Sequence, residues 1–131
     1  MTTTITDRTV YVIDPDEAVG EALAAFLDIY GFAVRLYAGV EDFVDANSLD
    51  ELAGGCLLID IDRSIQTVLT FLHRIGNRQP GFPVFLMTSL GSTEAGGALR
   101  DAPINGIIKK PFIHGVLIEQ LSHLFPVEMP A

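Results

Sequence analysis

The stretch that decides the fold is residues 55–62, which read GCLLIDID. Four apolar residues stand between a pair of glycines and two acids, Asp60 and Asp62. A run this short is typical of a strand buried on both faces rather than of a helix. Because ligands bind at the carboxyl ends of strands in parallel α/β sheets, we expect Asp60 to lie at an edge that hosts chemistry.

Strand patterns and helix patterns alternate along the rest of the chain. Further apolar or β-branched runs predict strands at 9–13, 33–37, 83–87 and 106–109. Helical spacing of apolar residues predicts helices at 18–30, 40–46, 64–78, 94–101 and 113–125, and Gly31 follows the first of them as a left-handed stop. Short connections favour right-handed crossovers. We therefore expect an α/β fold: a doubly wound, five-stranded parallel sheet with helices on both faces.

Composition limits the classes of function. The formal net charge of −9 repels phosphate backbones and argues against direct binding of nucleic acid or anionic membranes. The single cysteine, Cys56, excludes a disulfide framework and favours a reducing, cytoplasmic setting. The first residues lack the pattern of a signal peptide, and no apolar segment approaches the roughly 20 residues of a membrane span. We expect one domain over 1–131, with its core at about 8–125.

Polar side chains follow the expected strands at the edge where their carboxyl ends meet. They are Asp14, Asp16, Asp60, Asp62, Thr88, Ser89 and Lys110. Crowded carboxylates need a cation, and an oxygen-rich site of this kind suits Mg²⁺ rather than zinc. A carboxylate beside Mg²⁺ and a lysine is also a suitable nucleophile toward phosphorus, because both cations neutralise the charge on a transferring phosphoryl group.

Four segments in this order resemble a known family. They read VIDPDE at 12–17, LLID at 57–60, VFLMT at 84–88 and IIKKPF at 107–112. With them the chain resembles the receiver domain of two-component response regulators, close to the kind in FixJ-like transcriptional regulators. The resemblance implies a flavodoxin-like (CheY-like) fold with strand order 2-1-3-4-5.

The resemblance also implies roles for single residues. Asp60 would accept a phosphoryl group from a histidine kinase or phosphotransfer protein. Asp14, Asp60 and the backbone carbonyl of Asp62 would hold Mg²⁺. Thr88 would turn its hydroxyl to the phosphoryl oxygen, Lys110 would pair with the same group, and its peptide bond to the following proline would be cis. The chain would act chemically only on itself and would signal to an output domain or a downstream protein.

The chain departs from the family pattern at several positions. Pro15 replaces the second of two adjacent acids, so Asp16 is expected to reach the metal through a water. Ser64 and Val68 replace a proline and a glycine after the phosphoacceptor, which predicts a loop of different shape. Ile107 stands at the switch position that is commonly aromatic, which changes the coupling to Thr88. Glycines at 96–97 weaken the expected fourth helix, so a homodimer would be weak.

Other interpretations remain open at this stage. Asp16 could cap the first helix instead of serving a metal. The negative charge of Asp62 could restore part of the cation affinity lost at Pro15. The whole domain could be a pseudo-receiver that binds partners without phosphate. A flavodoxin-like electron carrier with bound FMN is a more remote alternative, because the acids after the first strand repel phosphate.

Overall fold

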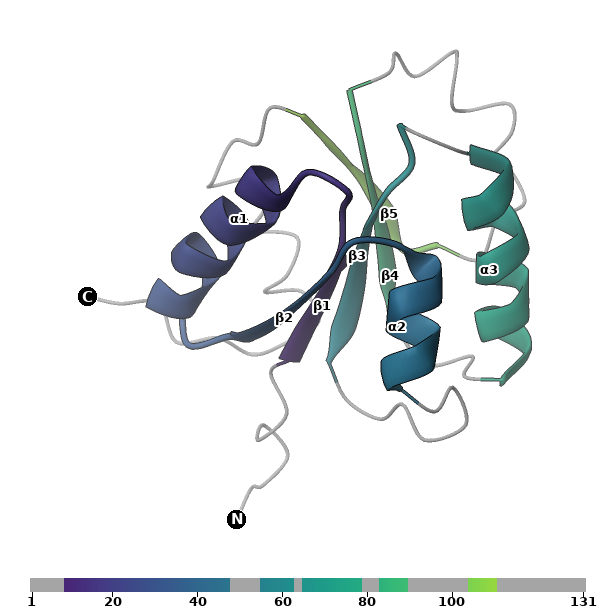
Figure 1. Ribbon diagram of the computed structural model, residues 1–131, viewed down its shortest axis with the longest axis horizontal. Coiled ribbons are helices and arrows are strands. Elements are labelled where there is room, and N and C mark those ends of the chain that lie inside the picture. Colours follow the sequence, from purple (N-terminus) through teal and green to yellow (C-terminus); the bar gives the residue numbers. More distant parts are fainter. Residues whose placement is uncertain (1–8, 48–54, 63–64, 79–82, 90–103, 111–131) are drawn as a thin grey trace.

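The computed structural model describes residues 9–47, 55–62, 65–78, 83–89 and 104–110. Strands and helices alternate along these segments, as Figure 1 shows. In chain order they are β1 (Thr9–Ile13), α1 (Glu17–Ile29), β2 (Ala33–Tyr37), α2 (Val40–Ala46), β3 (Cys56–Asp60), α3 (Ile65–Arg78), β4 (Val84–Thr88) and β5 (Gly106–Lys109). The helices expected over 94–101 and 113–125 lie outside the described residues.

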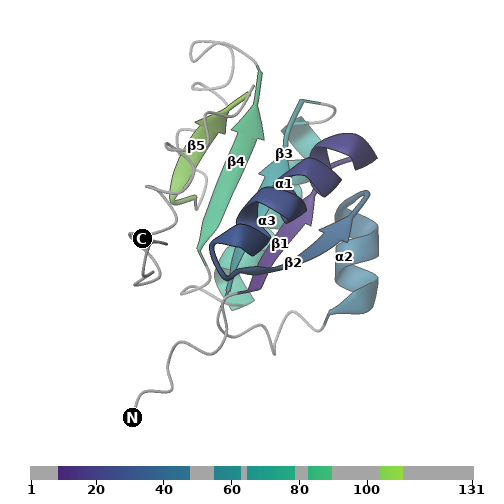
Figure 2. The ribbon, with the colours of Figure 1, turned by 90° about the vertical axis from the view of Figure 1, so that its left-hand side faces the viewer.

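All the strands belong to a single parallel sheet in the order β2-β1-β3-β4-β5. Helix α1 covers one face of this sheet, and α2 and α3 cover the other (Figures 1 and 2). The predicted doubly wound fold with strand order 2-1-3-4-5 is therefore confirmed. Because every strand runs the same way, the ends of β1, β3 and β4 meet at one edge.

The apolar run in β3 is buried on both faces, as its sequence predicts. Leu57 and Ile59 pack with residues of α2 and α3, among them Phe43, Phe71 and Leu72. Cys56 and Leu58 face the other way and pack with Leu23 and Leu27 of α1. Each fully buried aliphatic side chain contributes about 1.5–3 kcal/mol, so this strand anchors both layers of the core. Burial also raises the pKa of Cys56 to about 12, which keeps its thiol protonated.

Helix α1 and strand β4 are each shifted by one residue from the predicted 18–30 and 83–87, and two of the shifted boundaries concern polar residues of the sheet edge. Strand β4 extends through Thr88, because Lys110 donates its backbone N–H to the Thr88 carbonyl at 2.8 Å and continues the ladder. Helix α1 begins at Glu17, one residue early, because Asp16 caps it. Gly31 adopts φ 87° after this helix, as its sequence position predicts.

None of the helices within the described ranges is long and apolar enough to cross a membrane.

Candidate functional site

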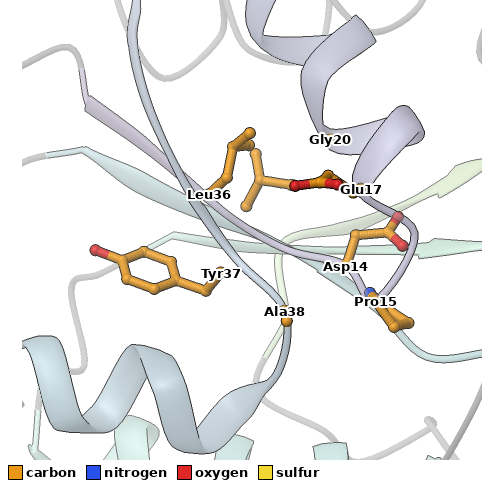
Figure 3. A pocket seen from close by; sticks show the side chains of 8 residues that line it. Asp14, Pro15, Glu17, Gly20, Leu36, Tyr37 and Ala38 are labelled. Carbon is orange, nitrogen blue, oxygen red and sulfur yellow. The ribbon is translucent and has the colours of Figure 1, made fainter.

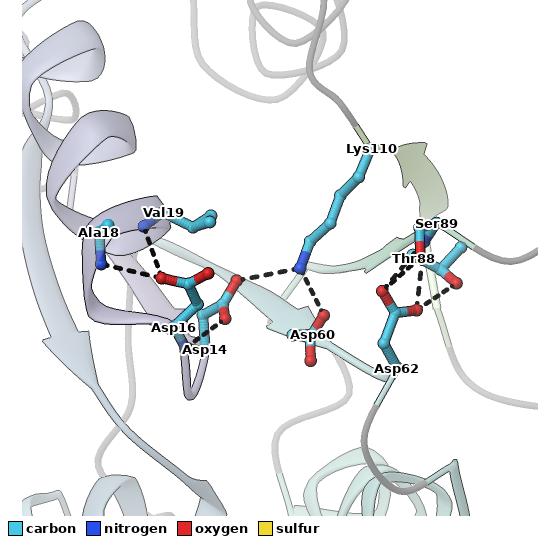
Figure 4. A network of polar contacts seen from close by, with 9 residues as sticks. All are labelled: Asp14, Asp16, Ala18, Val19, Asp60, Asp62, Thr88, Ser89 and Lys110. Carbon is cyan, nitrogen blue, oxygen red and sulfur yellow. Dashed lines mark hydrogen bonds and ion pairs between the residues drawn. The ribbon is translucent and has the colours of Figure 1, made fainter.

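Two buried carboxylates share one lysine at the carboxyl edge of the sheet (Figure 4). The Lys110 Nζ lies 2.7 Å from Asp60 Oδ1 and 3.3 Å from Asp14 Oδ2. The Asp14 and Asp60 side chains are 1% and 2% exposed, while that of Lys110 is 18% exposed. The three residues come from the ends of β1, β3 and β5, so the fold assembles a charged cluster from distant parts of the chain.

Local structure fixes the direction of these side chains. Asp60 is the last residue of β3, and Asp14 directly follows β1. The Asp14 N–H donates to the Tyr37 carbonyl at 3.0 Å, and its Oδ1 accepts the Asp16 N–H at 2.8 Å. This leaves Oδ2 of Asp14 for Lys110. The orientation of the Asp14 side chain is therefore fixed by the Asp16 N–H at one carboxylate oxygen and by Lys110 at the other.

The electrostatics of the cluster follow from burial and pairing. Burial raises the pKa of Asp60, the hydrogen bond and charge of Lys110 oppose this rise, and the charges of Asp14 and Asp62 add to it. Burial alone would lower the pKa of Lys110, but the hydrogen bond to Asp60 and the charges of both carboxylates outweigh it, so the pKa is raised. Lys110 therefore opposes the effect of burial on Asp60, and the two carboxylates in turn favour the charged form of Lys110.

Asp62 makes contacts that sequence reasoning missed. Its Oδ1 accepts the Thr88 hydroxyl at 2.7 Å, and its Oδ2 accepts the Ser89 hydroxyl at 2.8 Å. The Ser89 N–H lies 3.1 Å from each carboxylate oxygen. Burial would raise the pKa of Asp62, but the hydrogen bonds from Thr88 and Ser89 outweigh it and lower this pKa. Figure 4 shows Asp62 turned toward the end of β4.

Asp16 caps α1, which is one of the two interpretations that its sequence position allowed. Its Oδ1 accepts the backbone N–H groups of Ala18 at 3.0 Å and of Val19 at 3.3 Å. A carboxylate at a helix N-terminus satisfies otherwise unpaired donors and opposes the helix dipole. The same Oδ1 atom accepts both N–H groups.

The oxygen atoms at this edge fit a magnesium ion. Among the described residues, no group of three or more His, Cys, Asp or Glu side chains could hold a metal by itself. The two carboxylates of Asp14 and Asp60 nevertheless converge on one cationic group, Lys110 Nζ. Mg²⁺ usually binds through one or two carboxylates and keeps several waters, so this pair is a sufficient side-chain set.

A hollow of about 260 Å³ adjoins Asp14 on the side of α1 and β2 (Figure 3). Its lining includes Pro15, Glu17 and Leu36, but neither Asp60 nor Lys110. Leu36 is exposed at this edge of the sheet. The hollow is therefore a neighbour of the charged cluster, and Asp14 is the cluster residue that lines it.

Three further sequence departures have distinct positions. Pro15 is exposed in the turn between Asp14 and the start of α1. Val68 lies in α3 and is buried in the core, while Ser64 lies outside the described residues. Ile107 lies on the edge strand β5 and is 42% exposed, whereas the next residue, Ile108, is buried. The Ile107 side chain thus faces outward.

Comparisons with known proteins agree with this geometry. Residues 10–122 match the family model of the response regulator receiver domain. The chain is 27% identical over 118 residues to the transcriptional regulatory protein FixJ of Rhizobium meliloti, covering 90% of this chain and 57% of that protein. It is 31% identical over 103 residues to FixJ of Bradyrhizobium diazoefficiens, covering 79% and 49% respectively.

Structural similarity leads to the same family. The crystal structure of FixJ-N matches with a TM-score of 0.77 at 25% identity, covering 96% of this chain and 99% of that one. The chain spans about half the length of the curated relatives it matches. The family match covers most of the chain and includes Asp14, Asp60 and Lys110. The chain therefore belongs to the response regulator receiver domain family of two-component systems.

Proposed function

We propose that this chain is a phosphoacceptor domain in which Asp60 receives a phosphoryl group from a histidine kinase or a phosphotransfer protein. The observation that carries the proposal is the buried Asp60 carboxylate with Lys110 Nζ at 2.7 Å. A carboxylate oxygen of Asp60 attacks phosphorus, the P–N bond of phosphohistidine breaks, and the imidazole leaves with the bonding electrons. The product is an acyl phosphate on Asp60, and no further substrate is turned over.

The surrounding residues would share the charge of this step. Asp14, Asp60 and the Asp62 backbone carbonyl would hold Mg²⁺, and Asp16 would reach the ion through a water. The bound ion would neutralise charge on the phosphoryl oxygens. Lys110, which now pairs with Asp60, would pair with the phosphoryl group. The buried Thr88 hydroxyl would supply a hydrogen bond to it.

The output of the domain is part of the same proposal. Phosphorylation would change a protein-interaction surface that includes Ile107, and this change would act on an output domain or a downstream protein. The relatives are named as transcriptional regulators, and this chain covers about half of their length. We further propose that residues 1–131 form one receiver domain, with its core at about 8–125, that acts in the cytoplasm.

Incubation with acetyl phosphate and Mg²⁺ tests phosphorylation directly. Mass spectrometry should show one added phosphoryl group per chain, with acetate as the leaving group. Asp60→Asn should add none, because an amide oxygen is not nucleophilic enough. The Asp60→Asn protein should still fold, because the two side chains are nearly isosteric. Phosphoryl incorporation at another residue, or none in the wild type, would contradict the proposal.

A second candidate function is a pseudo-receiver that binds its partners without phosphate. Pro15 favours it, because proline replaces a metal ligand of the family with a side chain that binds no metal. Lack of a mass change with acetyl phosphate, together with unchanged amide NMR spectra on adding beryllofluoride, would support this candidate. The flavin-carrier alternative is dropped, because the chain belongs to the receiver family.

A further inference from the structure

The Asp62 carboxylate binds the two residues at the end of β4, Thr88 and Ser89. The Asp62 carboxylate receives the Thr88 hydroxyl, the Ser89 hydroxyl and the Ser89 N–H, all within 3.1 Å. Hydrogen bonds to a charged acceptor are about twice as strong as neutral ones. The Asp62 side chain therefore joins the end of β3 to the end of β4 beside the phosphoacceptor.

The donors that Asp62 holds are of the kind a phosphoryl group requires. A phosphoryl oxygen on Asp60 would also be an anionic acceptor, two bonds beyond the Asp60 carboxylate oxygen and at the end of β3, two residues before Asp62. Thr88 is 3% exposed and its hydroxyl has a single hydrogen to donate, so it cannot donate to both anions at once. Because Thr88 already donates to Asp62, a phosphoryl group on Asp60 gains less free energy from the Thr88 hydroxyl than it would from an unoccupied donor.

We propose that Asp62 is a positioning residue that competes with the phosphoryl group for the Thr88 hydroxyl and the Ser89 N–H. In the unphosphorylated protein, Asp62 holds these donors. Phosphorylation of Asp60 shifts the Thr88 hydroxyl to the phosphoryl oxygen and releases Asp62. The competition sets how readily the domain takes up the phosphoryl group and how completely it switches. This inference rests on the proposed phosphorylation of Asp60.

A different role for Asp62 predicts a different result. If its negative charge mainly strengthens Mg²⁺ binding, removing the charge should weaken the complex with a Mg²⁺-dependent phosphoryl mimic at limiting Mg²⁺ and leave it unchanged at saturating Mg²⁺. If Asp62 mainly competes for Thr88 and Ser89, removing it should strengthen that complex once Mg²⁺ is saturating. A gain in affinity at saturating Mg²⁺, or its absence, therefore separates the two roles.

The test is a titration with beryllofluoride at saturating Mg²⁺, followed by amide NMR, on the wild type and on Asp62→Ala. We expect Asp62→Ala to bind beryllofluoride about tenfold more tightly, because hydrogen bonds to a charged acceptor no longer have to be broken. Asp62→Asn is the matched control. Its one side-chain oxygen can still accept from Thr88, so we expect a gain of about threefold. If the role is mainly cation binding, saturating Mg²⁺ compensates for the weaker metal affinity, and neither variant should gain affinity for beryllofluoride.

A double-mutant cycle shows whether Asp62 acts through Thr88. In a Thr88→Val background, the gain from Asp62→Ala should shrink to about threefold or less, because one of the contested donors is absent. The Ser89 amide resonance should also shift in Asp62→Ala without any ligand. An equal gain in both backgrounds, or equal or weaker binding by Asp62→Ala, would overturn the inference while leaving phosphorylation of Asp60 intact. Absence of binding in every variant would overturn both.

Discussion

Two segments of the chain have the same pattern and meet at the same edge of the sheet. Residues 14–16 read Asp-Pro-Asp after β1, and residues 60–62 read Asp-Ile-Asp at the end of β3. In each segment the first acid is buried and contacts Lys110. In each, the second acid is exposed and accepts backbone N–H groups. The similarity follows from the register of the sheet, because Ile13 pairs with Ile59 in parallel strands and the next residues, Asp14 and Asp60, therefore stand at equivalent places.

The partners of the two second acids differ in their distance along the chain. Asp16 binds N–H groups two and three residues further on, so it stabilises only its own helix. Asp62 binds groups 26 and 27 residues away, so it connects two strands. A local cap can form whatever happens at Asp60. A contact between strand ends depends on their relative position, so only Asp62 is placed to respond to a new group on Asp60.

Removing Lys110 should have the largest effect, because it takes away the contact that the two segments share. Lys110→Met leaves Asp14 and Asp60 buried without their cation. Loss of one partner of a buried ion pair typically costs about 3 kcal/mol or more in the free energy of unfolding, and we expect a loss of about this size in metal-free buffer at neutral pH. Urea denaturation measures it.

Acidification should restore part of the stability of Lys110→Met. Burial already raises the pKa of Asp60, and the opposing hydrogen bond from Lys110 is lost in the variant. The folded variant then binds a proton more tightly than its unfolded chain, so its free energy of unfolding should rise as the pH falls from about 7 to about 5. Lys109→Met removes an exposed neighbouring charge and is the control. An equal loss in both variants would contradict the role given to Lys110.

Asp62→Ala should reduce stability by about 2 kcal/mol, the next largest effect, because several hydrogen bonds to a charged acceptor are lost at once. Thermal or urea denaturation measures the change. Hydrogen exchange at Ser89 should accelerate, since its N–H loses both carboxylate contacts. A loss smaller than that of removing the α1 cap would show that the connection between the strands is weaker than a local cap.

Most of the fold could be predicted from the sequence, because its signals are local. The apolar runs at β3 and β4 are long enough to be buried on both faces, and they alternate with amphipathic segments. Strand β5 and helix α2 begin and end at the predicted residues. Two of the boundaries that moved, at Thr88 and Glu17, depend on a hydrogen bond from Lys110 and on a cap by Asp16. A single hydrogen bond or cap of this kind leaves no mark in the hydrophobic pattern from which element boundaries are predicted.

The site was predictable in its members but only partly in its contacts. Parallel strands bring Asp14, Asp60 and Lys110 to the same edge whatever their rotamers. Their positions at the strand ends were therefore enough to predict that they form one site. The contacts of Asp62 with Thr88 and Ser89 were not predicted, since the charge of Asp62 alone is compatible with a cation as well as with hydroxyl donors. The available signal was that Thr88 and Ser89, two adjacent hydroxyl residues, follow the neighbouring strand. Which acid receives them depends on side-chain geometry that the sequence pattern does not contain.

Asp16→Ala should reduce stability by about 1 kcal/mol, a typical value for loss of an N-cap. The loss should be confined to α1, so the Ser89 amide resonance should not move. Asp16→Asn is the control, because its side-chain oxygen can still accept the Ala18 and Val19 N–H groups. If Asp16→Ala shifts Ser89 as Asp62→Ala does, the two segments are not independent and the comparison between them fails.

The smallest effect should appear in Mg²⁺ affinity when only the charge of Asp16 is removed. Asp16→Ser keeps a capping oxygen for α1, so stability should change little. If Asp16 reaches Mg²⁺ through a water, loss of its exposed charge should weaken binding by about two- to threefold, because solvent screens a contact of this kind. Calorimetric titration with Mg²⁺ measures the change. Unchanged affinity would limit Asp16 to its helix, and a tenfold loss would mean that it binds the ion directly and replaces the acid missing at Pro15.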